Sequence, residues 1–280
     1  QGARFFKKRN RNIIIKIDEE IKIHSNFIWL TLGQLKALMQ IDNIVNMDTR
    51  TVISGIPFGS FSAETIDFFN FLNKSGNYQT KFLRSALLKD DALHSMEEII
   101  TFMTQIKSVN DLDVKQIVLS EMHNWEITPN EIKHVENKYF KIIGVEVEIG
   151  NREVVKWSQP MVEPSQNGLC AFVCKEIHGV LHFAVQAKLE CGNHDIIEFA
   201  PTVQTLTDDY RVTPKNKLPF LDYILDVEKE KIYFDTLQSE EGGRFYKEQN
   251  RNMIIIAGNE ISDKLPENFI WMTLNQLYVF

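Results

Sequence analysis

The sequence has 280 residues, of which 44% are hydrophobic and 25% are charged, and its formal net charge is −7. This length and composition suit two ordinary globular domains with ample core. The acidic balance argues against a general nucleic-acid binder, which normally carries a basic face. No apolar run reaches the roughly 18 residues of a membrane span. We expect a cytoplasmic protein, because no signal peptide is visible and the three cysteines form no disulfide framework.

An internal repeat organises the chain. Its first twelve residues, QGARFFKKRNRN, match EGGRFYKEQNRN at 241–252 when the sequence is shifted by 240 positions. After a two-residue slip the match continues, from FIWLTLGQL at 27–35 to FIWMTLNQL at 269–277. A repeat with so long a period indicates two copies of a whole domain rather than a solenoid of small units.

The repeat predicts how the chain is divided. Residues 1–60 would be the C-terminal part of a first copy whose front is missing, residues 61–118 a connecting helical segment, and residues 119–280 the second copy. If the copies are equal, the missing front is on the order of a hundred residues. We therefore expect an α+β fold with two homologous halves, each a curved mixed β-sheet flanked by helices.

Local patterns predict the elements of the first copy. Residues 13–17 form a short apolar run that is typical of a buried strand. Residues 29–39 have helical spacing, and Thr31 is placed to cap the helix. In the stretch 45–57, polar groups precede a strand-like apolar segment that ends at a proline.

The connecting segment is predicted to be helical. Aromatic residues in 59–77 indicate a helix that packs on the next domain. Residues 95–109 are amphipathic, with two glutamates in the first turn where they suit the helix dipole. Residues 111–120 are expected to hold another short element.

The second copy is predicted to be mostly strand. Alternation and apolar runs indicate strands at 139–149, 169–175, 180–190, 196–199, 220–227 and 231–235, with a break at Pro201. The segment 180–190 is the most regular, with aliphatic residues and Phe183 on one face and His182, Ala184, Gln186, Lys188 and Glu190 on the other. We expect the first face to be buried. The second is either a solvated surface or the wall of a pocket, and the pattern leaves both open.

Gly242 and Gly243 are the first candidates for ligand binding. Glycine allows close approach of the backbone to a ligand or a positive φ. Backbone N–H groups beside the side chain of Arg244 suit a phosphate or a carbonyl oxygen. A tight turn with a salt bridge between Glu241 and an arginine explains the same residues, so the sequence leaves both interpretations open.

Metal binding is the rival interpretation of the second copy. Cys170, Cys174, His178, His182 and Cys191 lie near one another in the sequence, but their spacing fits no common ligand pattern. If Cys170 and Cys174 lie on one strand, they are roughly 13 Å apart, which is too far for both to bind a single ion. We therefore predict no metal site and expect buried, inert thiols.

Six collinear motifs resemble one known family. They are VNMDTRTVISGIP at 45–57, WSQP at 157–160, GVLHFAVQAKLE at 179–190, APTVQT at 200–205, QSEEGGRFY at 238–246 and NFIWMTLNQL at 268–277. Together they resemble the NDP-hexose 2,3-dehydratases over nearly the whole chain. The resemblance implies two homologous halves of Nudix-like topology, a homodimer, and sugar-nucleotide binding in each half. The metal-binding pattern of Nudix hydrolases is absent from the sequence, which disfavours that activity.

The resemblance implies a reaction on dTDP-4-keto-6-deoxy-D-glucose in deoxysugar biosynthesis. The C4 ketone acidifies the C3 proton, a base removes it, an oxyanion stabiliser holds the enolate, and an acid helps the C2 hydroxyl to leave. The product would be a 3,4-diketo-2,6-dideoxy sugar that a 3-ketoreductase takes over. No redox cofactor, metal or PLP is expected. The alternative is a non-catalytic dTDP-sugar-binding module of the same doubled fold.

The resemblance also leads to predicted roles for individual residues. Glu241 and His182 are the candidates for base and acid, with Tyr246 as a further donor. Arg244 and the neighbouring glycine amides are expected to contact phosphate or the enolate. The full set of predicted substrate contacts is Thr49, Arg50, Thr51, Ser54, Trp125, Gln186, Lys188, Thr202, Gln204, Ser239, Glu240, Gly242, Gly243 and Arg244.

Overall fold

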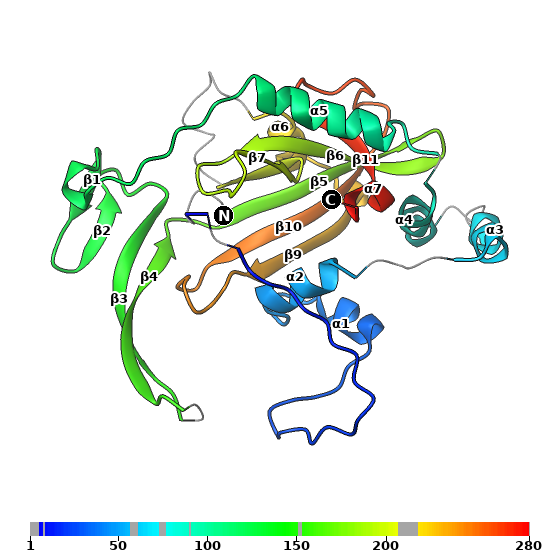
Figure 1. The fold of residues 1–280 in the computed structure, drawn as a ribbon. Coiled ribbons are helices and arrows are strands. Elements are labelled where there is room, and N and C mark those ends of the chain that lie inside the picture. Colours follow the sequence, from blue (N-terminus) through cyan, green and yellow to red (C-terminus); the bar gives the residue numbers. More distant parts are fainter. Residues whose placement is uncertain are drawn as a thin grey trace.

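The computed structural model describes residues 6–7, 9–56, 61–72, 77–89, 91–150, 153–206 and 218–279. Two β-sheets and several helices make up these residues, so the expected α+β class is confirmed (Figure 1). None of the helices in the described ranges is long and apolar enough to cross a membrane.

The larger sheet has seven strands. Its main order is β11-β6-β5-β10-β9, with β7 paired to β6 and β8 paired to β5. β10 runs parallel to β5 and antiparallel to β9, so the sheet is mixed. The strands are β5 (Gly168–Ile177), β6 (Val180–Leu189), β7 (Ile197–Ala200), β8 (Val203–Leu206), β9 (Ile232–Ser239), β10 (Gln249–Ala257) and β11 (Phe269–Thr273).

The smaller sheet is antiparallel, with the strands in the order β1-β2-β3-β4. They are β1 (Trp125–Ile127), β2 (Glu131–His134), β3 (Phe140–Glu148) and β4 (Lys156–Pro164). The hairpin of β3 and β4 extends away from the body of the molecule (Figure 1). Near its base, Val162 forms a single parallel bridge with Phe245, which ties the turn between β9 and β10 to β4.

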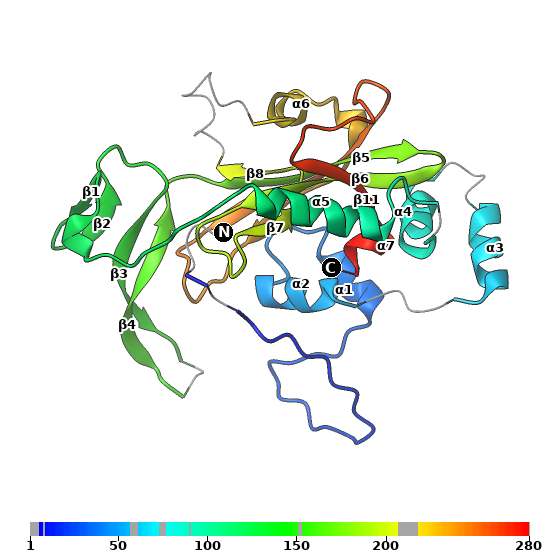
Figure 2. The ribbon, with the colours of Figure 1, turned by 45° about the horizontal axis from the view of Figure 1, so that its top comes forward.

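Helices cover both faces of the larger sheet (Figure 2). On one face, α4, α5 and α7 pack on Phe183 and its neighbours, and on the other face α6 and the chain around Ile261 pack on Ala184. The helices are α1 (Leu32–Leu38), α2 (Met47–Ser54), α3 (Ala63–Leu72), α4 (Tyr78–Leu87), α5 (Met96–Ser108), α6 (Leu221–Leu225) and α7 (Leu274–Leu277), with 3-10 turns η3 (Leu119–Glu121) and η4 (Lys229–Lys231).

The strands predicted for the second copy are largely confirmed, with two corrections. Residues 220–227 hold the short helix α6 instead of a strand, and Phe220 at its start has a left-handed backbone (φ 66°). The prediction that one face of β6 is an exposed polar surface or a pocket wall is also wrong for the first half of the strand. His182 and Ala184 on that face are both fully buried, because α6 and the segment 258–268 cover it.

Two strands predicted in the first copy are wrong, whereas its predicted helix cap is confirmed. Residues 13–17 are extended but unpaired, and Ile15 is 74% exposed. Within the stretch 45–57, residues 47–54 form helix α2, because Asn46 caps it with a side-chain oxygen that accepts from a backbone N–H of the first turn; Pro57 lies outside the described residues. Thr31 caps α1 in a reciprocal capping box with Gln34.

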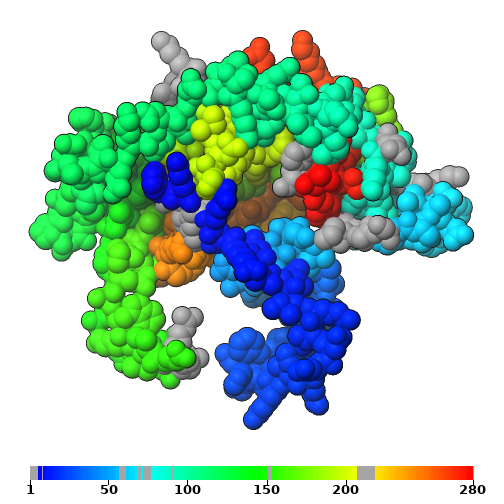
Figure 3. All heavy atoms as spheres, viewed as in Figure 1, coloured from blue at the N-terminus to red at the C-terminus, as the bar shows by residue number. Residues whose placement is uncertain are grey.

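Helix α5 confirms the prediction for 95–109, and α3 confirms that 59–77 contains a helix, although residues 57–60 and 73–76 lie outside the described ranges. The predicted packing of α3 through its aromatic residues is wrong, because Phe68 and Phe71 are 57% and 67% exposed. Residues 111–118 have no regular secondary structure, and residues 119–120 begin the single turn η3. The space-filling view shows that the segment before α1 projects from the body of the molecule (Figure 3).

Candidate functional site

The larger sheet divides where β5 and β6 separate, and Thr202 closes this fork. Pairing between the two strands ends at Cys174 opposite Phe183. At the next position, the hydroxyl of Thr202 accepts from the N–H of Val173 and donates to the carbonyl of Ala184. Thr202 is 1% exposed, so it satisfies the backbone of the fork and does not contact a sugar, which corrects its predicted role.

Beyond the fork, β8 pairs with β5 and β7 pairs with β6, and a cavity of about 300 Å³ lies where the strands diverge. We call it the fork cavity. The residues that line it are Gly168 and Cys170 of β5, Lys188 of β6 and Glu190 just after it, Gln204, Thr205 and Leu206 of β8, Asn250 of β10, and Phe140 of β3 with Tyr139 just before it.

Lys188 and Glu190 form an ion pair inside the fork cavity. Their Nζ and Oε1 atoms are 2.7 Å apart, and their side chains are only 20% and 15% exposed. Lys188 also donates to the carbonyl of Gln204 at 2.9 Å, so the ammonium group is fixed in place. Burial raises the pKa of the Cys170 thiol to about 11, so this group stays protonated at neutral pH. Two predicted contact residues, Lys188 and Gln204, are therefore brought together.

A polar network behind the cavity wall joins α2 to the end of β9 and to β10. Asn250 in the wall donates its amide N–H to a carboxylate oxygen of Glu240 at 2.7 Å. Arg50 of α2 donates to the carbonyl of Ser239 at 2.6 Å and to the side chain of Gln238 at 3.1 Å. Burial lowers the pKa of Arg50, and the charge of Glu240 opposes this shift. The predicted contacts Arg50, Ser239 and Glu240 thus support the wall from outside the cavity.

Position 168 must be glycine because the side chain of Asn250 lies very close to its backbone. A Cβ atom at position 168 would lie 2.0 Å from the side-chain oxygen of Asn250, nearer than any real contact. Because Asn250 is held by Glu240 and is 7% exposed, it could not yield without breaking that hydrogen bond. We expect any larger residue at 168 to displace Asn250 from the cavity wall.

The turn that contains Gly242 and Gly243 is attached to β4. The amide of Gln159 donates to the carbonyl of Gly243 at 2.7 Å, so the WSQP motif holds the glycine turn. Arg244 forms an ion pair with Glu241, with 3.2 Å between Nε and Oε1. The salt-bridged turn that the sequence left open is therefore present.

The fold itself does not require glycine at these two positions. Among the described glycines, only Gly179 has a positive φ, so that part of the prediction is wrong. A Cβ atom at Gly242 or Gly243 would meet nothing within 4 Å. The close approach of a ligand remains as a reason for the glycine pair.

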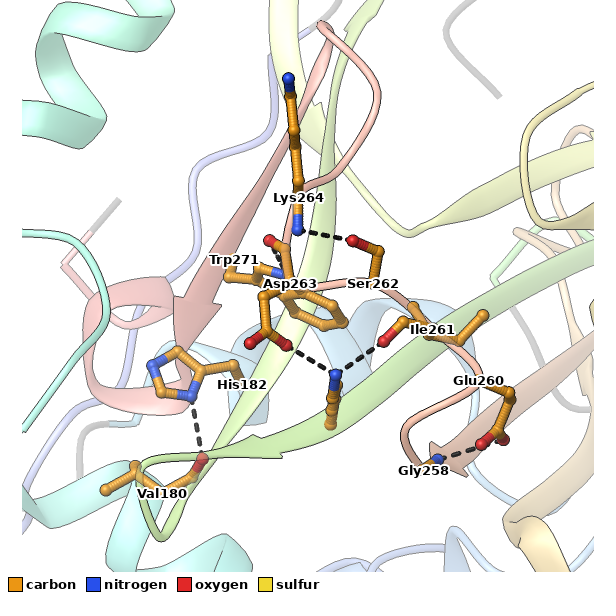
Figure 4. Close-up of polar contacts among 10 residues, drawn as sticks. Val180, His182, Gly258, Glu260, Ile261, Ser262, Asp263, Lys264 and Trp271 are labelled. Atoms are coloured by element: carbon orange, nitrogen blue, oxygen red, sulfur yellow. Dashed lines mark hydrogen bonds and ion pairs between the residues drawn. The ribbon is translucent and has the colours of Figure 1, made fainter.

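His182 lies at the opposite end of β6 from the fork cavity. It is six residues from Lys188, or roughly 20 Å along a strand. Its Nδ1 is 2.9 Å from the carbonyl of Val180 (Figure 4). Its Nε2 accepts from the N–H of Leu93 at 3.0 Å. Burial lowers the pKa of His182. Because both ring nitrogens are used and the residue is 0% exposed, His182 has a structural position, which corrects its predicted role as catalytic base or acid.

The neighbours of His182 form a second polar cluster, which anchors the segment before β11. The ammonium group of Lys175 donates to the carbonyl of Ile261 and to the carboxylate of Asp263, both at 2.6 Å. The indole N–H of Trp271 donates to the carbonyl of Asp263 at 3.0 Å (Figure 4). The polar residues at this end of the sheet therefore fasten a loop and do not form a pocket with Lys188.

Trp125 stands behind the aromatic wall of the fork cavity. Its ring packs against Phe140 at 5.0 Å and against His134 at 5.8 Å between centroids, and His134 in turn contacts Tyr139 at 5.2 Å. Phe140 and Tyr139 line the cavity, whereas Trp125 supports them.

The other predicted contacts lie apart from the cavity. On α2, Thr49, Thr51 and Ser54 lie on the helix surface, and the two last hydroxyls bond carbonyls of the helix itself. Gln186 of β6 lies between two neighbouring strands, opposite Ala200 of β7 on one side and Phe269 of β11 on the other. Tyr246 donates its backbone N–H to Val162 at 2.7 Å, and its ring carries the ammonium group of Lys247 at 5.3 Å.

The sequence model of the NDP-hexose 2,3-dehydratases matches residues 1–56 and 96–280. This chain belongs to the NDP-hexose 2,3-dehydratase family. A protein of Saccharopolyspora spinosa is 41% identical over 99% of this chain and 56% of its own length. Proteins of Streptomyces violaceoruber and Amycolatopsis orientalis are 38% and 33% identical, over 99% of this chain and 58% and 53% of their lengths. All three are named dTDP-4-dehydro-6-deoxy-α-D-glucopyranose 2,3-dehydratase. The chain spans about half the length of the curated relatives it matches.

Several wall residues of this dehydratase-family chain were not predicted as site residues. Asn250 belongs to the repeated NRN sequence, where Asn10 is its counterpart, and this repetition was the available signal. Glu190 shares the polar face with Lys188 in the alternating pattern of β6. Nothing in the local sequence marked Tyr139 or Cys170, because they come from distant parts of the chain and meet only at the cavity. In the described ranges, no three His, Cys, Asp or Glu side chains converge as a metal site.

Proposed function

We propose that the chain binds dTDP-4-keto-6-deoxy-D-glucose and catalyses loss of its C2 hydroxyl, giving a 3,4-diketo-2,6-dideoxy sugar. Membership of the family supports the reaction, and the names of the three relatives support the substrate. The observation that carries the proposal is the partly buried Lys188–Glu190 pair in the fork cavity. Enolate chemistry needs a base and a cation placed together, and this pair supplies both.

The dimensions of the fork cavity suit the sugar part of such a ligand. Its volume of about 300 Å³ is at the lower end of ligand pockets, which typically start near 300 Å³. The nucleotide would therefore extend past Tyr139 and Phe140. The strand β4 leads from Pro164, opposite Phe140, to Val162, where the glycine turn is attached. In this proposal the turn and the guanidinium group of Arg244 contact the diphosphate.

Three further parts of the prediction remain proposals. The product carries two adjacent ketones and is reactive, so a 3-ketoreductase is the class of enzyme that would consume it. A homodimer and a doubled Nudix-like topology are what the resemblance implies. The shared capping boxes of α1 and α7 support the idea of two related halves, because the repeat extends there from sequence to local structure.

The test is incubation of the protein with dTDP-4-keto-6-deoxy-D-glucose, followed by mass spectrometry and by titration calorimetry with dTDP. We expect a loss of one water from the sugar nucleotide and saturable binding of dTDP. The matched control is dTDP-D-glucose, which lacks the ketone and must keep its hydroxyl. Binding without loss of water would favour the alternative, a non-catalytic dTDP-sugar-binding module.

A further inference from the structure

The fork cavity contains one carboxylate and one cation among the described residues, and they contact each other. Glu190 is the carboxylate and Lys188 the cation. The other candidate bases lie elsewhere. Glu240 is behind the wall, where Asn250 donates to it, and Glu241 is paired with an arginine in the glycine turn. Among the described residues, Glu190 is therefore the carboxylate that lines the cavity itself.

We propose, on the basis of the proposed function above, that Glu190 removes the C3 proton and that Lys188 stabilises the enolate oxygen at C4. The two reacting positions are on adjacent carbons of the sugar, so a base and a cation that lie side by side can reach both. Lys188 is positioned by β6, and Glu190 follows directly after the strand, where the 2.7 Å ion pair with Lys188 holds it on the same side of the cavity. The carbonyl of Gln204 holds the ammonium group from a second direction.

Charge is conserved in the cavity during this step. The C3–H bond breaks, its proton goes to Glu190, and its electron pair forms the C3–C4 double bond while the ketone oxygen becomes negative. Lys188 loses a charged neighbour when Glu190 is neutralised and gains another in the enolate oxygen. In a partly buried site, such an exchange of partners avoids the penalty of leaving one charge without a partner.

The same carboxyl group can complete the elimination. In a gluco-configured ring, the C3 hydrogen and the C2 hydroxyl lie on the same face. The enolate re-forms the ketone, the C2–C3 double bond forms, the C2–O bond breaks, and the proton on Glu190 leaves with the hydroxyl as water. Glu190 is thereby restored to its carboxylate form, and the resulting enol tautomerises to the C3 ketone without another reactant. Cys170, whose thiol stays protonated, does not compete for the role of base.

The decisive variant is Glu190→Gln, assayed for water loss and for exchange of the C3 hydrogen with D₂O. We expect turnover to fall by about 100-fold to 10,000-fold, the range for loss of a general base, with C3 exchange abolished. Calorimetric binding of dTDP should be unchanged, because the amide keeps the shape of the side chain. Lys188→Met should lower turnover by about 100-fold or more, as loss of an oxyanion donor does.

The matched control is Glu198→Gln, which removes an exposed carboxylate on β7 directly opposite Lys188 in the sheet. It should turn over at the wild-type rate. If Glu190→Gln fails to fold, Glu190→Asp decides the question, because it retains the charge and moves the carboxylate by one methylene. A folded Asp variant with wild-type turnover, or a Gln variant with wild-type C3 exchange, overturns this inference while the proposed function stands. A wild-type chain that binds dTDP but loses no water overturns both.

Discussion

The two copies of the repeated segment have nearly the same side chains, but one copy is exposed to solvent and the other is buried. Residues 13–15 are Ile-Ile-Ile and residues 253–255 are Met-Ile-Ile, yet Ile15 is 74% exposed and its counterpart Ile255 is fully buried. In the second copy, β10 is hydrogen-bonded on both sides, to β5 and to β9. In the first copy, the corresponding run is extended and has neither neighbour among the described residues. An apolar run is thus competent to form a strand, but its neighbours decide whether the strand forms.

The largest difference is expected when Ile255 and Ile15, which match in the repeat, are each replaced with alanine in separate variants. Ile255→Ala should lower the free energy of unfolding by about 2–5 kcal/mol, because it opens a cavity in the packed core. Ile15→Ala should change it by less than about 0.5 kcal/mol, as exposed substitutions do. Urea denaturation of both variants, followed by circular dichroism, measures the difference. Equal losses would mean that residues 13–15 are packed in solution as tightly as β10.

A smaller effect is expected at the two capping boxes. Thr273 at the start of α7 is fully buried, and Leu277 of that helix packs in the core, whereas α1 after Thr31 has no buried residue. Thr273→Ala should therefore lower the free energy of unfolding by about 1–2 kcal/mol, the upper part of the range for loss of a cap. Thr31→Ala should fray α1 without moving the global transition. Amide hydrogen exchange of Gln34 and Gln276 separates local fraying from global loss.

The smallest effect concerns Glu260, whose counterpart in the first copy is Glu20. Glu260 accepts from the backbone of Gly258 at 3.1 Å and from the hydroxyl of Tyr223 at 2.8 Å, and Lys231 lies 3.0 Å away. These contacts lower the pKa of Glu260 to about 2 from a usual value of 4.5. Its contribution to stability is therefore present above about pH 4.5 and is lost as the pH falls towards 2.

Melting temperatures of Glu260→Gln and wild type should accordingly differ slightly at neutral pH and converge as the pH falls from 4.5 towards 2. The side chain of Glu260 is 38% exposed, so solvent keeps the difference small. Glu20→Gln serves as the control, because this residue is exposed in the unpaired segment, and it should follow the wild type throughout. A difference between Glu260→Gln and wild type that persists at pH 2 would contradict the assigned ionisation.

The sequence predicted those elements whose signal is local. The alternation over Val180–Leu189 and the reciprocal cap of Thr31 both appear as expected. The strand prediction at 45–57 failed because β-branched residues outweighed the cap signal of Asn46. The prediction of a polar face along β6 failed at His182, because alternation cannot show that a second layer covers the sheet.

The candidate site could be predicted only where its residues share a strand. Lys188 was identified from its position on β6, and Glu190 lies on the same face. Asn250 comes from β10, and its place in the wall depends on the parallel pairing that sets it opposite Gly168. Thr202 was wrongly predicted to contact the ligand. Its hydroxyl instead bonds the backbone of Val173 and Ala184, where β5 and β6 separate.

The contacts between the α1–α2 region and β9 also bear on self-association. β9 is the last strand of the larger sheet, and the side chain of Asp42 accepts from the N–H of Leu237 at 2.9 Å while the N–H of Asn43 donates to its carbonyl at 3.0 Å. These two residues occupy hydrogen-bonding groups that another chain could otherwise use. A shortened protein that begins after α2 would present a bare strand edge, and such edges template polymerisation into fibres or aggregates.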